Sequence, residues 1–429
     1  MTKFQIILTG VLGGFIVIGV IAFATVRTSG TTASAVTVWG TMQPATFSSI
    51  LDASGLAKDK TFNITYVKKD QSSFQNDFIE ALASGTSPDL IITTQDKVLE
   101  NKDKLYAIPY SSISKNDFSN AFISEAELLM LSDGIYGLPF VVDPMVMYWN
   151  RTMFSNKGVS QPPQYWSQLF DLVKLFTVRD ASLSISKTAV ALGEYTNVNH
   201  AKDLLSLLSM QAGTPIVNQG QGGLQSVLAE RFGYTLVPAE AALDFYTSFA
   251  NPAKTFYAWN RSLPNSQDMF VAGNLALYFG YASEITLIQA KNPNLDFNVT
   301  TMLQNEGGDV NTTFGELYVM SIPKRATDIT GAFKLAVALS GQTGNSAASS
   351  ATGLPPVRRD LLATKPESSY GQTFFTSALW SKAWLDPNSN ATEKVFKDMI
   401  ENVTSGKLRV SQAVGQAHST LQTLLSPIK

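Results

Sequence analysis

The feature that most restricts the fold is a regular alternation of strand-like and helix-like segments in residues 36–92. Residues 36–39 and 63–67 are rich in β-forming side chains, and residues 88–92 form a third, apolar strand. Between them, residues 47–56 and 74–83 read as helices, the second with apolar side chains at helical spacing and an end at Ser84-Gly85. This alternation is typical of a parallel sheet covered on both faces. Such sheets bind ligands at the carboxyl ends of their strands, here residues 39–43 and 94–97.

The rest of the chain continues the mixture of helices and strands. Predicted helices cover residues 166–176, 201–212, 224–230, 240–249 and 332–339, with a short helix that starts at Phe270 and is cut at Gly273. Predicted strands cover residues 275–279, 295–303 and 317–322. Residues 341–350 read as a small-residue loop and residues 353–358 as a turn-rich crossing. The remainder is predicted to be helical, with a loop at residues 387–390.

Residues 133–150 contain two short apolar, strand-like runs. Asp133-Gly134 is a tight-turn pair, and Asp143-Pro144 separates the runs at a predicted turn. One interpretation is a strand leaving one lobe and a strand entering another, with the Asp143 carboxylate at the crossing. The other is an ordinary hairpin with an exposed aspartate.

Length, charge and cysteine content set further bounds. A chain of 429 residues is longer than the chains that usually form a single hydrophobic core, which indicates two lobes or domains. The formal net charge of −2 and the lack of a long basic run argue against nucleic acid as a partner. The absence of cysteine excludes disulfides, thiolate metal sites, cysteine nucleophiles and a lipid-modified cysteine. His200 and His418 are the only histidines, so a multi-histidine metal site or a His-dependent triad is hard to build. We predict no cofactor and no metal, and we interpret His200, beside a helix start, as a solvated residue.

Residues 4–26 carry no charge and lie between Lys3 and Arg27. Because a helix of that length spans a hydrocarbon core of roughly 30 Å, we predict a retained transmembrane anchor. Cleavage near Ala33-Ser34-Ala35, which has the small-x-small form, is the alternative. The chain downstream is expected outside the cytoplasm, attached to the cell membrane by a single span, or secreted or periplasmic if the segment is cleaved.

An ordered series of short motifs carries a resemblance that covers most of the chain from Val36 onward. The series comprises VTVW at 36–39, ASG at 83–85 before Pro88-Asp89, DG at 133–134 with YGLPF at 136–140, YWN at 148–150, PP at 162–163 before Trp166, FVAGN at 270–274, and GLP at 353–355 before Val357-Arg358-Arg359. In this order and spacing the chain resembles the extracellular solute-binding proteins of family 1, the maltose-binding-protein-like sugar-binding subunits of ABC importers.

The resemblance implies an α/β two-lobe periplasmic-binding-protein fold of type II, with three hinge crossings and an N-terminal transmembrane helix before it. The crossings would fall near residues 141–143, 299–301 and 353–356. The first lobe would hold residues 36–141 and 301–352, and the second residues 142–300 and 353–429. The resemblance also implies a non-catalytic monomer that captures a carbohydrate, such as an oligosaccharide, for the transmembrane subunits of an ABC permease. Two departures are the missing lipidated cysteine and the sequence Gln-Tyr-Trp-Ser at 164–167, where the family often has Thr-Trp-Asp.

A sugar site pairs aromatic platforms with carboxylate, amide and basic side chains. Carried over by motif, the predicted ligand-binding residues are Trp39, Thr41, Met42, Gln43, Thr94, Asp96, Lys97, Phe140, Asp143, Trp259, Tyr281, Glu316 and Arg358. Some have purely structural alternatives. Trp39 is equally compatible with the core, and Asp96 with a helix N-cap. Glu316 and Arg358 are compatible with bridging the lobes.

The sequence is compatible with two other functions. The first is a membrane-anchored extracellular glycoside hydrolase, which needs two carboxylates at roughly 5–9.5 Å and would use residues such as Asp96 and Asp143. The second is a ligand sensor whose closed form docks on a receptor kinase instead of a permease.

Overall fold

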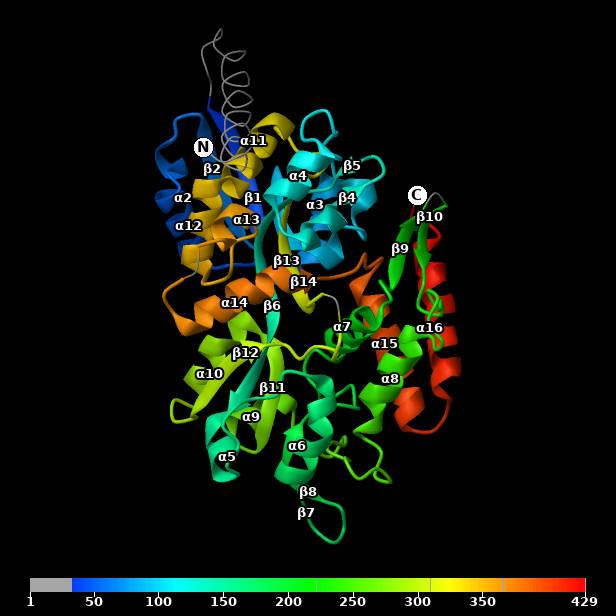
Figure 1. Cartoon of the computed structure of the whole chain (residues 1–429). Coiled ribbons are helices and arrows are strands. Elements are labelled where there is room, and N and C mark those ends of the chain that lie inside the picture. Colours follow the sequence, from blue (N-terminus) through cyan, green and yellow to red (C-terminus); the bar gives the residue numbers. More distant parts are fainter. Residues whose placement is uncertain (1–32, 221, 309, 365, 429) are drawn as a thin grey trace, which may run out of the picture.

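The structure, a computed structural model, describes residues 33–220, 222–308, 310–364 and 366–428 (Figure 1). Within these residues ten strands form one mixed sheet, with the path β2-β1-β3-β13-β6-β11-β8-β7 and with β12 added on β6 and β14 on β13. The strands of this sheet are β1 (Ser34–Gly40), β2 (Phe62–Lys68), β3 (Leu90–Thr94), β6 (Leu138–Asn150), β7 (Val178–Arg179), β8 (Ile185–Val190), β11 (Leu275–Tyr281), β12 (Phe297–Thr301), β13 (Thr313–Ser321) and β14 (Ser381–Lys382). Two short pairs lie outside it, β4 (Met130–Leu131) with β5 (Gly134–Ile135) and β9 (Val217–Gly220) with β10 (Gly223–Ser226).

Helices surround the sheet and divide between its two ends. They are α2 (Pro44–Ala53), α3 (Phe74–Ser84), α4 (Lys115–Ala121), α5 (Arg151–Asn156), α6 (Leu169–Phe176), α7 (Ala201–Ala212), α8 (Pro238–Ser248), α9 (Ser266–Val271), α10 (Ile285–Lys291), α11 (Ile329–Ser340), α12 (Gln342–Thr352), α13 (Arg359–Leu362), α14 (Ser369–Trp380), α15 (Ser389–Thr404) and α16 (Val410–Leu425). In Figure 1, α2, α11 and α12 lie with β1 and β2 at one end, and α5, α6, α9 and α10 lie with β8 and β11 at the other. This is a mixed α/β fold of two lobes.

Strand β6 joins the two lobes. Its first half pairs antiparallel with β13, from Leu138 opposite Met320 to Pro144 opposite Gly315. Its second half pairs instead with β11, beginning with Met145 opposite Tyr281, and with β12 on the other side. The turn predicted at Asp143-Pro144 is therefore wrong, because the strand continues through it. Asp143 does lie at the crossing, but it is buried, so the hairpin interpretation with an exposed aspartate is wrong as well.

The contacts of the chain also place the other two predicted crossings, after β12 and at residues 353–358. After β12 the chain stays on the second lobe as far as Thr312, whose carbonyl accepts a hydrogen bond of 2.8 Å from Gln211 on α7. It then enters the first lobe as β13, between β3 and β6. Residues 353–358 run along the first lobe, where the amide of Ile123 donates to the carbonyl of Val357 over 2.9 Å. The lobe boundaries derived from the resemblance stay predictions.

Two local predictions are wrong for identifiable reasons. Residues 224–230 do not form a helix, since residues up to Ser226 belong to strand β10, which pairs with β9. Residues 341–350 are not a loop but most of helix α12, which packs against α2. It also packs closely against α11, since a β-carbon on Gly344 would lie 2.6 Å from the Cα atom of Leu339. The small residues that suggested a loop instead allow this helix to pack closely against its neighbours.

The membrane anchor predicted at residues 4–26 lies outside the described residues. Within the part of the chain that the structure describes, none of the helices combines the length and the apolar character that a membrane crossing requires.

Candidate ligand-binding cavity

A cavity of about 850 Å³ lies between the two lobes. Residues from three parts of the fold surround it. The first lobe contributes Thr41, Gln71, Ser72, Phe74, Gln75, Ile92, Thr93, Thr94, Gln95, Asp96 and Lys97. The crossing strands contribute Asp143, Phe314, Glu316 and Tyr318, and the second lobe contributes Asn199, His200, Lys202, Asp203, Gln267, Tyr281, Ser283, Glu284, Leu287, Trp384, Asp386, Ser389, Asn390 and Glu393.

Several residues of the cavity wall lie at or just after the ends of strands. Thr41 follows β1, and Asp96 and Lys97 lie in the 3₁₀ helix η2 (Gln95–Lys97) directly after β3. Tyr281 is the last residue of β11, in the second lobe. Because these strands are parallel to their neighbours β2, β1 and β8, their carboxyl ends carry polar loops at one edge of the sheet. The predicted position of the site at those ends agrees with the cavity.

Asp143 is the buried carboxylate of the crossing, with 2% of its surface exposed. Its Oδ1 atom accepts a hydrogen bond of 3.0 Å from the backbone amide of Ser283. Burial raises the pKa of Asp143 to about 6, the nearby Glu284 carboxylate adds to the rise, and Ser283 and the His200 charge oppose it. Asp143 is therefore an acid whose charge changes just below neutral pH.

Glu316 stands directly opposite Asp143, on β13. Among the described residues its carboxylate has neither a hydrogen-bond partner nor an ion-pair partner. Burial raises the pKa of Glu316 well above its usual range, and the charges of Asp143 and Asp96 raise it further. The crossing thus presents two adjacent carboxyl groups to the cavity.

His200 and Glu284 form a hydrogen-bonded pair on the second-lobe wall. The backbone of His200 is left-handed, with φ 58°, a conformation that is uncommon for non-glycine residues and clusters at functional sites. Its Nε2 atom lies 2.7 Å from Oε1 of Glu284, whose Oε2 atom accepts hydrogen bonds from Tyr278 and Gln267. Burial opposes the ionisation of both groups, but their mutual hydrogen bond and attraction outweigh it: the pKa of His200 is raised and that of Glu284 is lowered. The prediction that His200 is simply solvated is wrong, because the turn at the start of α7 directs its ring to Glu284.

Lys97 connects the two lobes at one side of the cavity. Its ammonium group donates to the hydroxyl of Ser389 at the start of α15, and it also lies 3.6 Å from Glu100 and 3.7 Å from Asp96. A second bond between the lobes runs beside it, from Nδ2 of Asn388 to Oε1 of Glu100 over 3.0 Å. These contacts hold η2 of the first lobe against α15 of the second.

Lys202 and Asp386 form a buried ion pair at the cavity wall, with an N–O distance of 2.7 Å. Lys202 also donates to Thr392 over 2.9 Å. Its ammonium group lies 5.6 Å from the ring centre of Trp384, whose indole N–H donates to Ser206 over 3.2 Å. Lys202 therefore lies between the carboxylate of Asp386 and the ring of Trp384.

The cavity wall combines aromatic rings with many polar groups. The rings are those of Phe74, Tyr281, Phe314, Tyr318 and Trp384. Tyr281 is held in place by its hydroxyl, which donates to Asp203 over 2.9 Å. Aromatic faces pack on C–H surfaces, and carboxylates, amides and ammonium groups hydrogen-bond to hydroxyls. This combination suits a polyhydroxylated ligand with apolar faces.

Seven of the predicted ligand-binding residues line the cavity: Thr41, Thr94, Asp96, Lys97, Asp143, Tyr281 and Glu316. The other six have contacts elsewhere. Trp39 packs under the ammonium group of Lys69, the Met42 carbonyl accepts from Tyr66, and the Gln43 side chain accepts from Lys68. Phe140 is fully buried and its carbonyl accepts from Asn345, Trp259 is fully buried and donates to Asn197, and Arg358 pairs with Asp360.

Sequence reasoning missed most of the second-lobe wall. Trp384, Asp386, Ser389, Asn390 and Glu393 come from one short stretch. Its signal was present: a tryptophan precedes the polar Asp-Pro-Asn-Ser-Asn run that was assigned only as a loop.

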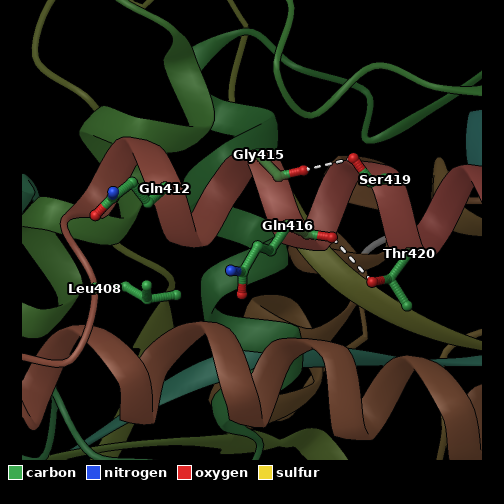
Figure 2. Close-up of a pocket in the computed structure, with 6 residues that line it drawn as sticks. All are labelled: Leu408, Gln412, Gly415, Gln416, Ser419 and Thr420. Atoms are coloured by element: carbon green, nitrogen blue, oxygen red, sulfur yellow. Dashed lines mark hydrogen bonds between the residues drawn. The ribbon is translucent and has the colours of Figure 1, made fainter.

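A second, open depression of about 540 Å³ lies over the outer face of α16 (Figure 2). Leu408, Gln412, Gly415, Gln416, Ser419 and Thr420 line it. Figure 2 shows that the hydroxyls of Ser419 and Thr420 donate to carbonyls of their own helix, at Gly415 and Gln416. With those donors used and no charged side chain in its lining, this surface gives no comparable case for ligand binding.

The fold and the cavity together define a class: ligand-binding proteins that hold a small molecule between two α/β lobes. A sequence model described as "Bacterial extracellular solute-binding protein" matches residues 54–375. The chain therefore belongs to the bacterial extracellular solute-binding protein family.

Comparison with individual proteins agrees at the level of the fold. Binding proteins of Brucella abortus and Brucella suis are 28% identical over 89 residues, which is 20% of this chain, and the match spans only 22% of the length of these curated relatives. The crystal structure of a cyclo/maltodextrin-binding protein complexed with maltotetraose has a TM-score of 0.72 at 17% identity, over 94% of this chain and 100% of that one. The GacH receptor of Streptomyces glaucescens, solved unliganded and with acarbose, has a TM-score of 0.69 at 15% identity, over 93% and 100% of the two chains.

Proposed function

We propose that this protein captures a carbohydrate between its two lobes, outside the cytoplasm, and delivers it to the transmembrane subunits of an ABC import permease. The observation that carries the proposal is the composition of the cavity. Its volume of about 850 Å³ lies within the range of about 300–1,000 Å³ that is usual for small-molecule sites. Its wall supplies aromatic faces together with carboxylate, amide and ammonium groups, which are the groups that bind sugars.

The family and the neighbouring structures support this proposal. The neighbours' own ligands, maltotetraose and acarbose, are described for those proteins. Capture by closure needs contacts from both lobes with one ligand. The lining meets this requirement, since Asp96 and Lys97 face the cavity from the first lobe, and Asp203 and Trp384 from the second.

Calorimetry against a panel of mono- and oligosaccharides, with amino acids and polyamines included, tests the ligand class. We expect binding of at least one sugar, with an affinity reduced at least tenfold in Trp384→Phe. Trp149→Phe is the matched control, because Trp149 packs on Phe154 and does not line the cavity. Binding of an amino acid or polyamine with no response to any sugar would defeat the carbohydrate assignment.

We also propose that residues 4–26 anchor the protein in the membrane. Terminal sequencing of protein recovered from the membrane fraction tests this, because an intact start at Met1 supports the anchor and a start near Ser34 supports cleavage. A pair of permease genes beside this gene supports delivery to a transporter. A receptor-kinase gene in that place supports a sensor.

A further inference from the structure

Asp143 and Glu316 are cross-strand partners in the centre of the molecule. They stand directly opposite each other on β6 and β13, and both line the cavity. Directly opposite residues of an antiparallel pair point to the same face, with Cβ atoms about 4.5–5.5 Å apart. Like charges in such a pair destabilise a sheet. A ligand that binds both carboxyl groups would supply the partner that neither has among the described side chains.

The cations of the cavity wall are already engaged elsewhere. Lys97 contacts Ser389, Asp96 and Glu100, and Lys202 is paired with Asp386. His200 is bonded to Glu284. Among the described residues, no lysine, arginine or histidine forms an ion pair with Asp143 or Glu316. The two carboxyl groups thus face the cavity without an ion-pair partner among the described residues, and the nearest positive charge, on His200, is shared with Glu284.

The surroundings of the pair add to the negative potential. Asp203 and Glu393 also line the cavity; they accept hydrogen bonds from the hydroxyls of Tyr281 and Tyr195, and Asp203 also lies 4.0 Å from Nδ1 of His200. The lining contains seven carboxyl groups (Asp96, Asp143, Asp203, Glu284, Glu316, Asp386 and Glu393) but only two lysines and His200. A ligand that brings a positive charge would be attracted to this wall, whereas a neutral one leaves the excess charge uncompensated.

We propose that the bound carbohydrate carries a protonated amine, and that its ammonium group lies between the carboxylates of Asp143 and Glu316. This inference rests on the proposed capture of a carbohydrate and specifies its chemical class as an amino sugar. Charge-assisted hydrogen bonds from one ammonium group reach both carboxylates and remove their mutual repulsion. Tyr318, two residues from Glu316 on the same face of β13, offers an aromatic ring beside the charge.

Matched pairs of sugars that differ only at the nitrogen test the proposal. Calorimetry on the full chain at low salt compares glucosamine with N-acetylglucosamine, galactosamine with N-acetylgalactosamine, and the glucosamine trimer with its fully acetylated form. In at least one pair we expect the amine to bind ten times or more tighter than the acetylated sugar. Raising the salt concentration should weaken binding of the amine far more than binding of the neutral sugar.

Variants connect the preference to the carboxylate pair. Glu316→Gln keeps the shape of the side chain and should reduce the preference for the amine at least fivefold. Glu127→Gln is the matched control, because Glu127 is exposed and lies outside the cavity lining. Asp143→Asn provides a second, independent test of the same loss if Glu316→Gln does not fold.

The outcomes separate this inference from the proposed function. Equal or tighter binding of the neutral sugar in every pair overturns the amino-sugar proposal and leaves carbohydrate capture intact. Binding of spermidine with no response to any sugar overturns both.

Discussion

Glu125 lies against Gly315 so closely that a β-carbon on that glycine would be 2.2 Å from Oε2 of the glutamate. Glu125 has 2% of its surface exposed, and neither of its carboxyl oxygens has a hydrogen-bond partner among the described residues. Burial raises the pKa of Glu125 to about 8. The residue behind the carboxylate pair of the cavity is therefore an uncharged acid at neutral pH.

The buried acid predicts how stability depends on pH. Since the folded-state pKa of Glu125 is above its unfolded value, the unfolded chain ionises first, and stability falls as the pH rises between about 4.5 and 8. Each pKa unit corresponds to about 1.4 kcal/mol. We expect Glu125→Gln to gain stability relative to the natural protein across this window, as measured by urea unfolding at pH 5, 7 and 9. An unchanged difference at the three pH values would contradict the shift.

The close contact predicts a second stability effect. Gly315→Ala places a methyl group against the carboxyl of Glu125, whose side chain is buried. We expect a loss of about 1–3 kcal/mol in the free energy of unfolding, the usual range for overpacking. Gly415→Ala is the control, because a β-carbon there meets no atom within 4 Å.

Asp143 predicts the pH dependence of ligand binding. The charged groups that face it are Glu316 on β13, Glu284 after β11 and His200 at the start of α7. Since the pKa of Asp143 is about 6, its negative charge is lost as the pH falls through that value. We expect the affinity for an amine-bearing sugar to fall between pH 7.5 and pH 5, and to fall less in Asp143→Asn. Calorimetry at four pH values measures this, and a flat profile for the natural protein would count against the role of Asp143.

The Lys202–Asp386 pair predicts a large effect from the loss of one partner. Their side chains are 8% and 4% exposed, so Lys202→Met leaves an uncompensated buried carboxylate. Breaking a buried pair in this way costs about 3–5 kcal/mol. Lys174→Met is the control, since the Lys174–Asp171 pair is largely exposed and is worth about 1 kcal/mol or less. Thermal unfolding of both variants compares the two sites, and equal melting temperatures would show that the buried pair adds little.

The contacts of Lys97 across the lobes predict an effect on closure. Lys97→Met removes the bond to Ser389 but keeps most of the side chain. We expect the ligand-free variant to have a larger radius of gyration than the natural protein in small-angle scattering, because the lobes separate more often. Lys69→Met is the control, since Lys69 pairs with Asp77 inside the first lobe. Identical scattering curves for both variants would show that Lys97 does not hold the lobes together.

Local pattern was sufficient to predict much of the fold. The alternation in residues 36–92 corresponds to β1, α2, β2, α3 and β3, because each element buries its own apolar face against the adjacent one. The pattern failed where a contact distant in sequence decides the structure. β6 continues through Pro144 because β13 and β11 are its partners, and α12 is helical because its small residues pack against α2 and α11.

The residues of the cavity also divide into those that local pattern predicts and those that depend on contacts distant in sequence. Residues at strand ends, such as Asp96 and Tyr281, could be placed because parallel strands deliver their carboxyl ends to one edge. His200 could not be placed, because its partner Glu284 is 84 residues away in the sequence. Trp259 shows the opposite error: it was predicted to bind ligand, but it is fully buried in the core and its indole N–H donates to Asn197.

The exchange of partners along β6 has a mechanical consequence. If one lobe rotates against the other, we expect β6 to twist near Pro144, where its partner changes from β13 to β11. Asp143 is adjacent to that point, so its carboxylate should move little, whereas the parts of the cavity wall far from β6 should move much more. A ligand can then bind near the hinge before the lobes close. Recognition of its charge would precede the enclosure of its remaining surface.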